Sequence, residues 1–447
     1  MREHRSTTLV VGAGLPGIVA SYVLAERGHQ VVLLDSAPAI GGLLRSYEFE
    51  GFSYDYGTHF ASRTGIPELD NILFGGFESE WLEFPCLKAA NFWNGVLNES
   101  SDNPDLNTLG RDCHNHCLAE LLSAPGWLDE KAPDNARQYL LAEYGPILIE
   151  KFFDPVFQKF IGRTSEQLHH QANQLFNLKR FAVLDPSATT ELKRSERFNA
   201  KVSFHHRDHF DGHRTSLYPR SGGIGGWIDQ LRSKLEIVGV QIITGSRIKH
   251  IEYSSRQVIK VSLGDLEIYP KKVFWSVAPA IFCKLAGIAL EHKPTAMRTT
   301  ILVGLECDSP FLSACQYCTV FDSNYEIFRV TLYDNFRERL GVSSRYASSV
   351  EFMIEPDRVS TADWMYVAEI EMRRMGFIDV KANVLSRHQK VIPNGFPVQT
   401  NAEIYAHSQQ VKTVRSVENV HLIGRASGDG WFLTDLVSKA YSLASKI

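Results

Sequence analysis

The sequence predicts an α/β protein that begins with a Rossmann-type, dinucleotide-binding domain. An apolar stretch starting at Leu9 leads into a glycine-rich turn ending at Gly17. A second apolar stretch then ends at Asp35. A buried strand, a tight turn, a helix and a second strand followed by an acid are the parts of a dinucleotide-binding βαβ unit. The chain has 447 residues, which is enough for two or three domains.

The glycines in this turn have the spacing G-x-G-x-x-G. The first permits a tight turn, the second lets a pyrophosphate approach the backbone, and the third lets the helix pack closely on the strand. The helix start also offers free N–H groups and a positive dipole end to phosphates. The acid after the second strand is placed to bind a ribose hydroxyl. The predicted contacts here are Gly12, Gly14, Leu15, Pro16, Gly17, Asp35 and Ser36.

Composition excludes several classes of function. The formal net charge is -4 and there is no basic arm, so nothing indicates nucleic-acid binding. No apolar run approaches the length of about 18 residues that a membrane span needs. The polar start, Met1 to Ser6, leads directly into the first strand and leaves no room for a signal peptide. Seven cysteines, an odd number, favour reduced thiols, and we expect a cytoplasmic protein.

Two cysteine clusters raise the alternative of a metal or redox site. Cys113-His-Asn-His-Cys117 places four potential ligands in five residues, and Cys315 and Cys318 have C-x-x-C spacing. The spacing of Cys113 and Cys117 also fits one face of a helix, and Cys315 lies among strand-like residues rather than at a helix start. We therefore predict no metal site and treat these thiols as buried or incidental.

A second glycine element follows the first βαβ unit. Gly41 and Gly42, followed by Arg45, permit another close backbone approach beside a cation, which a domain binding only NAD does not need. The next stretch, Tyr47 to Phe60, reads as a β-hairpin that ends in the turn Gly57-Thr58-His59.

This series of motifs resembles the FAD-binding half of a flavoenzyme superfamily. That group contains the flavin amine oxidases, protoporphyrinogen oxidase, the carotenoid desaturases and UDP-galactopyranose mutase. The resemblance implies FAD as the cofactor. It places Gly41, Gly42, Leu43, Leu44 and Arg45 along the pyrophosphate and ribityl chain, and Gly57, Thr58 and His59 against the isoalloxazine.

Later segments resemble the points where such chains return to the FAD domain. By this resemblance, the backbone of Ile248 contacts the adenine end. Near the C-terminus a strand ends at Gly424 and Arg425, and Asp435 opens a helix whose dipole faces the flavin. The resemblance assigns Gly424, Arg425, Thr434, Asp435 and Leu436 to cofactor contact, with His59 and Arg425 as electrostatic groups beside the reacting flavin.

The resemblance also implies the domain organisation. Residues 1–60, 216–290 and 388–447 form a discontinuous FAD-binding domain. An inserted α+β substrate domain comprises 61–215 and 291–387, with a helical region from 134 to 167 and strands over 297–306, 316–320 and 327–332. We also predict a helix over 361–375.

The spacing of several motifs matches the UDP-galactopyranose mutases, whereas the residues at their substrate-contacting positions differ. Phe152-Phe153, Lys159 and Gly162 match a mutase segment in spacing, but Ile161 stands where those enzymes have a tryptophan near the sugar nucleotide. The stretch 429–432, Asp-Gly-Trp-Phe, replaces a Tyr-Lys-Tyr-Tyr that holds the diphosphate. The amine oxidases' lysine near flavin N5 has no counterpart in 297–306, and their covalent-flavin cysteine pattern is absent.

We therefore predict a UDP-galactopyranose mutase-like, FAD-dependent oxidoreductase of carbohydrate metabolism. Its expected substrate is a sugar, a nucleotide sugar or a sugar-derived metabolite. Basic residues between 170 and 215 are a candidate patch for an anionic substrate. The alternatives are a redox-neutral flavin-dependent mutase, an amine oxidase, and a non-catalytic FAD-binding protein. A homodimer is also left open.

Overall fold

A computed structural model describes residues 4–210, 212–290, 297–337, 345–430 and 432–447. The chain forms two compact units, and each is built from separate segments. Unit 1 comprises Met1–Phe84, Thr215–Pro294 and Ile404–Ile447, and unit 2 comprises Pro85–Arg214 and Thr295–Glu403. The bounds of these units differ from the predicted domain bounds at 61–84 and 388–403. The assignment of the two domains to cofactor and substrate remains a proposal.

Unit 1 is built on a parallel sheet. Strand β1 pairs with β2 on one side and with β15 on the other, β12 extends the sheet beyond β2, and β21 pairs with the second half of β15. The resulting order, β12-β2-β1-β15-β21, is that of a Rossmann half-sheet. These strands are β1 His4–Val11, β2 Val31–Leu34, β12 Gln241–Ile243, β15 Glu267–Trp275 and β21 Val420–Leu422.

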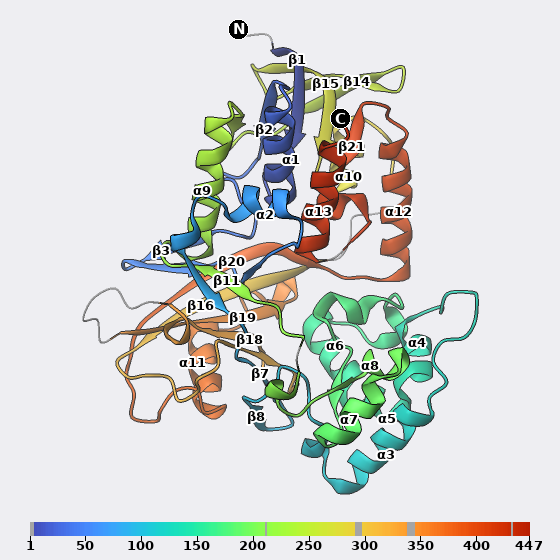
Figure 1. Ribbon diagram of the computed structural model, residues 1–447, viewed down its shortest axis with the longest axis vertical. Helices are drawn as coiled ribbons and strands as arrows, with labels where there is room; N and C mark the ends of the chain where they lie inside the picture. The colour runs from blue at the N-terminus through green and yellow to red at the C-terminus, as the bar shows by residue number, and fades with distance from the viewer. Residues whose placement is uncertain (1–3, 211, 291–296, 338–344, 431) are drawn as a thin grey trace. The chain divides into compact units, whose positions relative to one another are not determined.

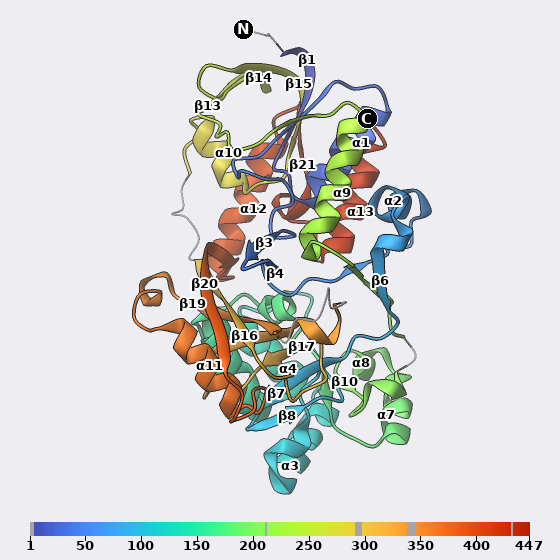
Figure 2. The same ribbon diagram turned by 90° about the vertical axis from the view of Figure 1, so that its left-hand side faces the viewer.

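Helices cover both faces of this sheet (Figures 1 and 2). Helix α1 packs against α9 and α13 on one face. On the other face, side chains of α10 and α12 join those of the strands in one apolar core. The helices are α1 Leu15–Glu26, α2 Pro67–Phe74, α9 Gly223–Ile237, α10 Pro279–Leu285, α12 Asn401–Arg415 and α13 Leu433–Ala444.

Short antiparallel elements complete unit 1. The predicted hairpin is present as β3 and β4, and a β-meander of β13 and β14 leads into β15. A small sheet has the order β5-β11-β6. The bounds are β3 Ser46–Phe49, β4 Phe52–Asp55, β5 Ala61–Ser62, β6 Trp81–Phe84, β11 Ser216–Pro219, β13 His250–Ser254 and β14 Gln257–Ser262.

Unit 2 contains a seven-stranded, mostly antiparallel sheet in the order β20-β16-β19-β18-β17-β7-β8. The turn between β7 and β8 is Asn94-Gly95, and both residues have positive φ (51° and 75°), as a two-residue hairpin requires. The three predicted strands of this sheet are confirmed as β16, β17 and β18. The bounds are β7 Ala89–Trp93, β8 Val96–Asn98, β16 Met297–Cys307, β17 Tyr317–Val320, β18 Ile327–Leu332, β19 Tyr346–Ile354 and β20 Val384–Pro397.

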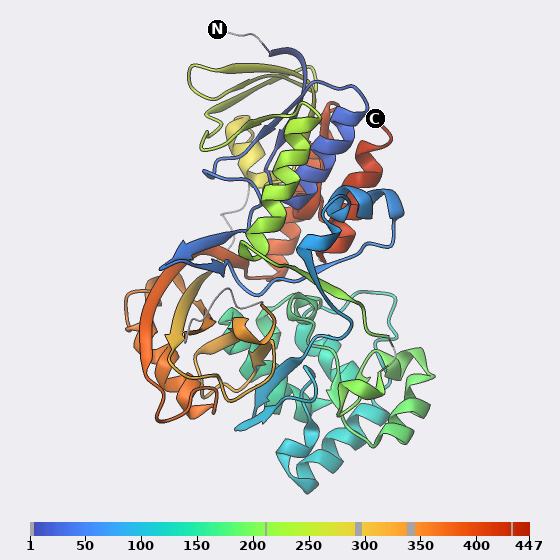
Figure 3. The ribbon, with the colours of Figure 1, turned by 60° about the vertical axis from the view of Figure 1, so that its left-hand side comes forward.

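Helices of unit 2 form two apolar cores. Helix α11 packs on one face of the sheet, apart from a second helical region (Figure 3). That region buries an aromatic cluster that includes Phe152, Phe153 and Phe160. A π-helical turn, Ile149–Phe153, leads into α6. The remaining elements are α3 Arg111–Ser123, α4 Ala136–Tyr144, α5 Pro146–Leu148, α6 Asp154–Ile161, α7 Pro186–Lys193, α8 Glu196–Asn199, α11 Trp364–Arg374, β9 Phe181–Ala182 and β10 Val202–Ser203.

The cysteine clusters fall where the sequence predicted. Cys113 and Cys117 lie one turn apart on α3, and Cys318 lies in β17. Within the described ranges, no group of three or more potential ligands gathers in a way that could hold a metal ion. None of the helices in those ranges combines the length and the apolar character that crossing a membrane demands.

Candidate functional site

The predicted cofactor residues follow the carboxyl ends of the parallel strands in unit 1. Gly12 follows β1, Asp35 follows β2, and Gly424 comes shortly after β21. Because the strands are parallel and in register, these ends meet at one edge of the sheet. In open α/β sheets, ligands bind in the crevice at this edge. The fold therefore brings together turns that are about 400 residues apart in sequence.

The three glycines of the first turn have different surroundings. Gly12 has φ +95°, and a Cβ there would lie 2.2 Å from Ser276 Oγ. A Cβ on Gly17 would lie 2.0 Å from the carbonyl oxygen of Gly12. Gly14, the N-cap of α1, has ordinary dihedrals, and a Cβ there would meet nothing within 4 Å. Packing thus requires the first and third glycines, while the middle one leaves open space at the helix start. Leu15 is buried in α1, and Pro16 stands in its first turn.

Asp35 ties the glycine turn to β2. Its Oδ2 accepts a hydrogen bond from the N–H of Ala13 (2.7 Å), and its Oδ1 accepts one from Ala37 (2.8 Å). Each carboxylate oxygen has a second lone pair, so Asp35 keeps capacity for a ribose hydroxyl. The neighbouring Ser36 is exposed.

The second glycine element lies against the first. Gly41 donates its N–H to Ala13 O (2.7 Å), and a Cβ on Gly42 would lie 3.6 Å from Gly14 Cα. Arg45 Nε donates to Gly42 O (2.7 Å), so this cation also stabilises the loop that carries it. Leu44 is buried and Leu43 is 40% exposed.

Asp55 fixes the hairpin that precedes the Gly57-Thr58-His59 turn. This buried carboxylate accepts hydrogen bonds from Ser46 Oγ (2.7 Å), Tyr218 OH (2.6 Å) and the N–H of Ile224 at the start of α9. The turn itself follows directly. Gly57 has φ +114°, a conformation that favours glycine, and Thr58 and His59 are half-buried.

The C-terminal turn lies beside the N-terminal one. Gly424 has φ +61°, and a Cβ there would lie 3.4 Å from Pro16 Cγ. Arg425 is exposed within the 3₁₀ turn η9, Gly424–Ser427. Thr434, Asp435 and Leu436 form the first turn of α13, where Leu436 is buried. Ile248 is half-buried in the loop between β12 and β13, and Trp431 lies outside the described residues.

The basic residues of 170–215 do not all serve as free cations. Arg207 donates to four backbone carbonyls: Leu87 O (2.9 Å), Ala89 O (2.8 Å), Ser100 O (3.1 Å) and Glu99 O. His205 Nδ1 lies 2.9 Å from Asp105 Oδ2, and this hydrogen bond raises the pKa of the imidazole. Both groups therefore stabilise unit 2 itself.

A cavity of about 320 Å³ in unit 2 brings Ile161 together with several residues that the sequence did not single out. It lies between the end of α6, the start of β16 and the turn after β19. Its lining includes Ile161, the residue at the mutase tryptophan position. The lining residues are Ile161, Arg163, Met297, Arg298, Glu355, Pro356, Asp357 and Val398.

Two guanidinium groups in this cavity share one carboxylate. Arg298 Nη1 lies 3.3 Å and Arg163 Nη1 lies 3.6 Å from Glu355 Oε1. Arg298 is only 5% exposed, and its Nη2 donates to Met353 O (2.6 Å) and Lys159 O (3.2 Å). Its Nε is buried with no hydrogen-bond partner among the described residues. Burial lowers the pKa of Arg298, yet a guanidinium stays protonated at neutral pH. Asp357 also lines the cavity, so the lining holds two guanidinium groups and two carboxylates.

Comparison with known proteins agrees with the Rossmann-type start. Residues 10–72 match a family model described as an NAD(P)-binding Rossmann-like domain. An L-amino-acid oxidase of Sistrurus catenatus edwardsii is 43% identical over 49 residues, 11% of this chain and 10% of that protein. The match thus spans about a tenth of the length of this curated relative.

Similarity to solved structures extends over the whole chain. Reduced UDP-galactopyranose mutase has a TM-score of 0.76 at 14% identity and covers 98% of this chain and 92% of its own. A candidate protoporphyrinogen oxidase from Exiguobacterium sp. 255-15 has a TM-score of 0.68 at 17% identity, covering 100% and 99%. The chain therefore shares the fold of these two solved structures. This flavoenzyme fold confirms the predicted α/β class and supports the prediction of FAD as cofactor.

Ser276, Asp55 and the group around Glu355 could not be identified from the sequence. Ser276, whose Oγ lies 2.9 Å from Gly12 O, follows β15 without any motif. Asp55 stands at the end of a hairpin, which is a common position for acidic residues and so carries no functional signal. Arg298, Arg163 and Glu355 come from three distant segments, and their only shared signal is their position at element ends. Local sequence patterns do not reveal contacts between residues that are distant in the sequence.

Proposed function

We propose that this protein is an FAD-dependent oxidoreductase acting on a small, anionic or sugar-linked metabolite. The observation that carries this proposal is the open space at Gly14, where a Cβ on Gly42 would lie 3.6 Å from Gly14 Cα and a Cβ on Gly424 would lie 3.4 Å from Pro16 Cγ. Three glycine turns gathered at one sheet edge fit a long dinucleotide whose two halves need separate backbone approaches. A side chain at Gly14 or Gly42 would occupy the space in which the dinucleotide is proposed to contact the backbone.

Each cofactor residue has a proposed role. Gly12, Gly14 and Gly17 with the start of α1 hold the pyrophosphate, and Asp35 accepts from the adenosine ribose. Gly41, Gly42 and Arg45 follow the ribityl chain. Gly57, Thr58 and His59 lie beside the ring system, together with Gly424, Arg425 and the first turn of α13. The backbone of Ile248 takes the adenine end.

FAD supplies a two-electron acceptor when bound. The residues proposed beside it have an electrostatic task. The N-terminus of α13 and the cation of Arg425 favour negative charge, and His59 offers a ring nitrogen that can donate a hydrogen bond. Of these groups only the imidazole of His59 can both donate and accept a proton at a ring nitrogen, so it is the residue proposed to hold a proton at the site.

The substrate class is inferred from the unit 2 cavity. Two guanidinium groups share the carboxylate of Glu355 beside the apolar side chain of Ile161, and Arg298 Nε has no hydrogen-bond partner among the described residues. Guanidinium forks suit phosphate and carboxylate groups. We infer that the substrate carries such a group, which fits a nucleotide sugar or a sugar acid. Ile161, having no aromatic ring, offers no stacking surface of the mutase kind.

One observation favours a second candidate, the redox-neutral mutase. Reduced UDP-galactopyranose mutase shares the fold over nearly the whole chain, and the spacing from Gly424 to Asp435 is the one typical of that group. The amine oxidase alternative has less support, because the similarity to L-amino-acid oxidases covers only about a tenth of this chain.

Anaerobic mixing of the FAD-loaded protein with candidate substrates separates these functions. Nucleotide sugars, sugar acids and amines are tested in parallel. Bleaching of the oxidised flavin band by a sugar-linked anion supports the oxidoreductase. Turnover only after dithionite reduction supports the mutase, and bleaching by amines alone supports an amine oxidase. A protein that binds no FAD would overturn all three.

A further inference from the structure

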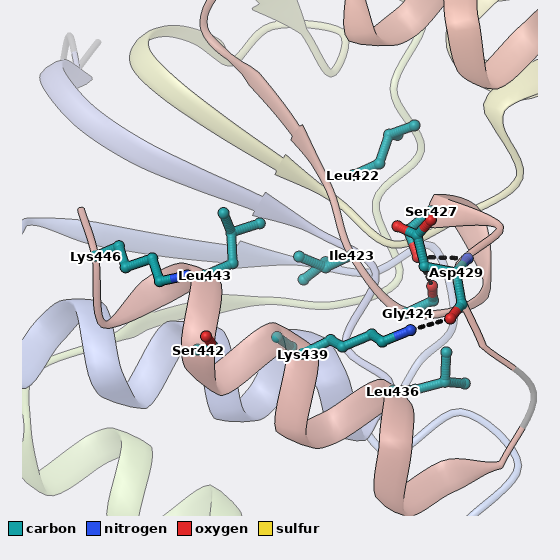
Figure 4. Close-up of a pocket in the computed structure, with 11 residues that line it drawn as sticks. Leu422, Ile423, Gly424, Ser427, Asp429, Leu436, Lys439, Ser442, Leu443 and Lys446 are labelled. Carbon is teal, nitrogen blue, oxygen red and sulfur yellow. Dashed lines mark hydrogen bonds between the residues drawn. The ribbon is translucent and has the colours of Figure 1, made fainter.

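A second cavity, of about 440 Å³, lies in unit 1 between the end of β21, the turn η9 and helix α13 (Figure 4). Gly424 and Leu436 border it, but the Gly12–Gly17 turn and the Gly41–Arg45 loop are not among its lining residues. The cavity thus borders the Gly424 turn but is separate from the two N-terminal glycine turns assigned to the dinucleotide.

The floor of this cavity is apolar. Leu422 and Ile423 contribute from β21 and its end, and Leu436, Ala440 and Leu443 contribute from α13. The three helical residues are spaced at four and three positions, so they line one face of the helix. Figure 4 shows Ile423 and Leu443, which both line this floor.

Two lysines stand at the two ends of that face. Lys439 and Lys446 are seven residues apart on α13 and its end, which places them on the same side of the helix, about 10 Å apart along its axis. Lys439 Nζ donates to the backbone oxygen of Asp429 (Figure 4). Within the part of the chain that the structure describes, the Lys446 ammonium has no hydrogen bond or ion pair.

The acid in the cavity lining does not neutralise these lysines. Asp429 is the lining carboxylate, and its Oδ2 lies 2.6 Å from Arg415 Nη2. Lys439 reaches only the backbone carbonyl of Asp429. The cavity therefore offers two ammonium groups around an apolar floor, with the hydroxyl groups of Ser427 and Ser442 also in the lining.

We propose that this cavity is a second ligand site, which binds an organic anion with an apolar body. The carboxylate or phosphate of the ligand pairs with Lys439 and Lys446, and its apolar part covers Ile423 and Leu443. A small inorganic anion would leave the floor uncovered, and a neutral apolar molecule would leave both ammonium groups unpaired. The site is independent of the substrate proposed for unit 2.

Calorimetric titration of the full-length, FAD-loaded protein tests this proposal. The probes are octanoate, AMP and inorganic phosphate at equal ionic strength. We expect saturable binding of octanoate or AMP, and weaker binding of phosphate. Octanoate binding alone indicates a fatty carboxylate, and AMP binding alone indicates a nucleotide.

Three variants assign any binding to this cavity. The double variant Lys439→Ala with Lys446→Ala should lower the affinity for the probe that binds at least tenfold. Leu443→Glu should do the same, because it places a charge on the apolar floor. Lys412→Ala, an exposed lysine of α12 in the same unit, is the matched control and should change nothing. The proposal is overturned if neither octanoate nor AMP binds, if phosphate binds as tightly as they do, or if the lysine pair can be removed without loss.

Discussion

The glycine turns of unit 1 and the arginine cavity of unit 2 are two differently built sites. The first is made of backbone, and its defining residues are those that lack a side chain: Gly12, Gly14 and Gly17. The second is made of side chains, above all Arg298 and Arg163 around Glu355. A backbone site tolerates almost no substitution at its turns. A side-chain site can change its ligand by exchanging one or two residues.

This contrast explains what could be predicted from the sequence. The first site depends on local spacing, so the turn at Gly12–Gly17, the Asp35 position and the hairpin before His59 could all be predicted. The fold class followed from the same motifs. The unit 2 cavity could not be predicted, because Arg163, Arg298 and Glu355 come together only through the pairing of β16 with β19 and the position of α6.

The largest expected effect comes from Gly17→Ala. Its methyl group would lie 2.0 Å from the carbonyl oxygen of Gly12, and a backbone atom cannot move aside as a side chain can. We expect a loss of about 3 kcal/mol in the free energy of unfolding. Urea denaturation followed by circular dichroism measures it. Unchanged stability would show that the turn is not packed as described.

Arg298→Met tests the side-chain site. The variant removes a nearly buried cation and leaves the carbonyls of Met353 and Lys159 without this donor. We expect unfolding to become easier by about 2 kcal/mol. Arg163→Met is the matched control, because Arg163 is more exposed and should cost no more than about 0.5 kcal/mol.

Arg163→Met also tests the substrate class. If the cavity holds the anionic group, this variant should raise KM about tenfold, while FAD affinity stays at the wild-type value. Steady-state kinetics with the substrate identified by flavin bleaching gives the answer. An unchanged KM would remove the cavity from the proposed substrate site.

Gly14→Ala separates cofactor binding from folding. The added methyl group meets nothing within 4 Å, so the fold should tolerate it, yet it projects where the pyrophosphate is proposed to lie. We expect a wild-type unfolding midpoint for the apoprotein and a tenfold or greater loss of FAD affinity. A stability loss like that of Gly17→Ala would contradict the difference between the two glycines.

A further expected effect is a pH dependence in unit 2. Lys159 Nζ donates to Val320 O (2.7 Å) and Asp322 O (2.8 Å), and burial lowers its pKa to about 7. In the unfolded chain this pKa is about 10.4. Between these values the unfolded state binds more protons, so stability should rise with pH from 7 towards 10. The difference in stability between wild type and Lys159→Met should shift in favour of wild type over that window. A difference that stays constant with pH would contradict the lowered pKa.

The central claim is that the glycine turns of unit 1 hold FAD, and a titration of apoprotein with FAD tests it most directly. Quenching of flavin fluorescence should saturate at one FAD per chain for the wild type. The Gly14→Ala variant should need at least ten times more FAD, and Gly28→Ala, at the far end of α1, should titrate like the wild type. No saturable binding, or equal binding by wild type and Gly14→Ala, would contradict the claim.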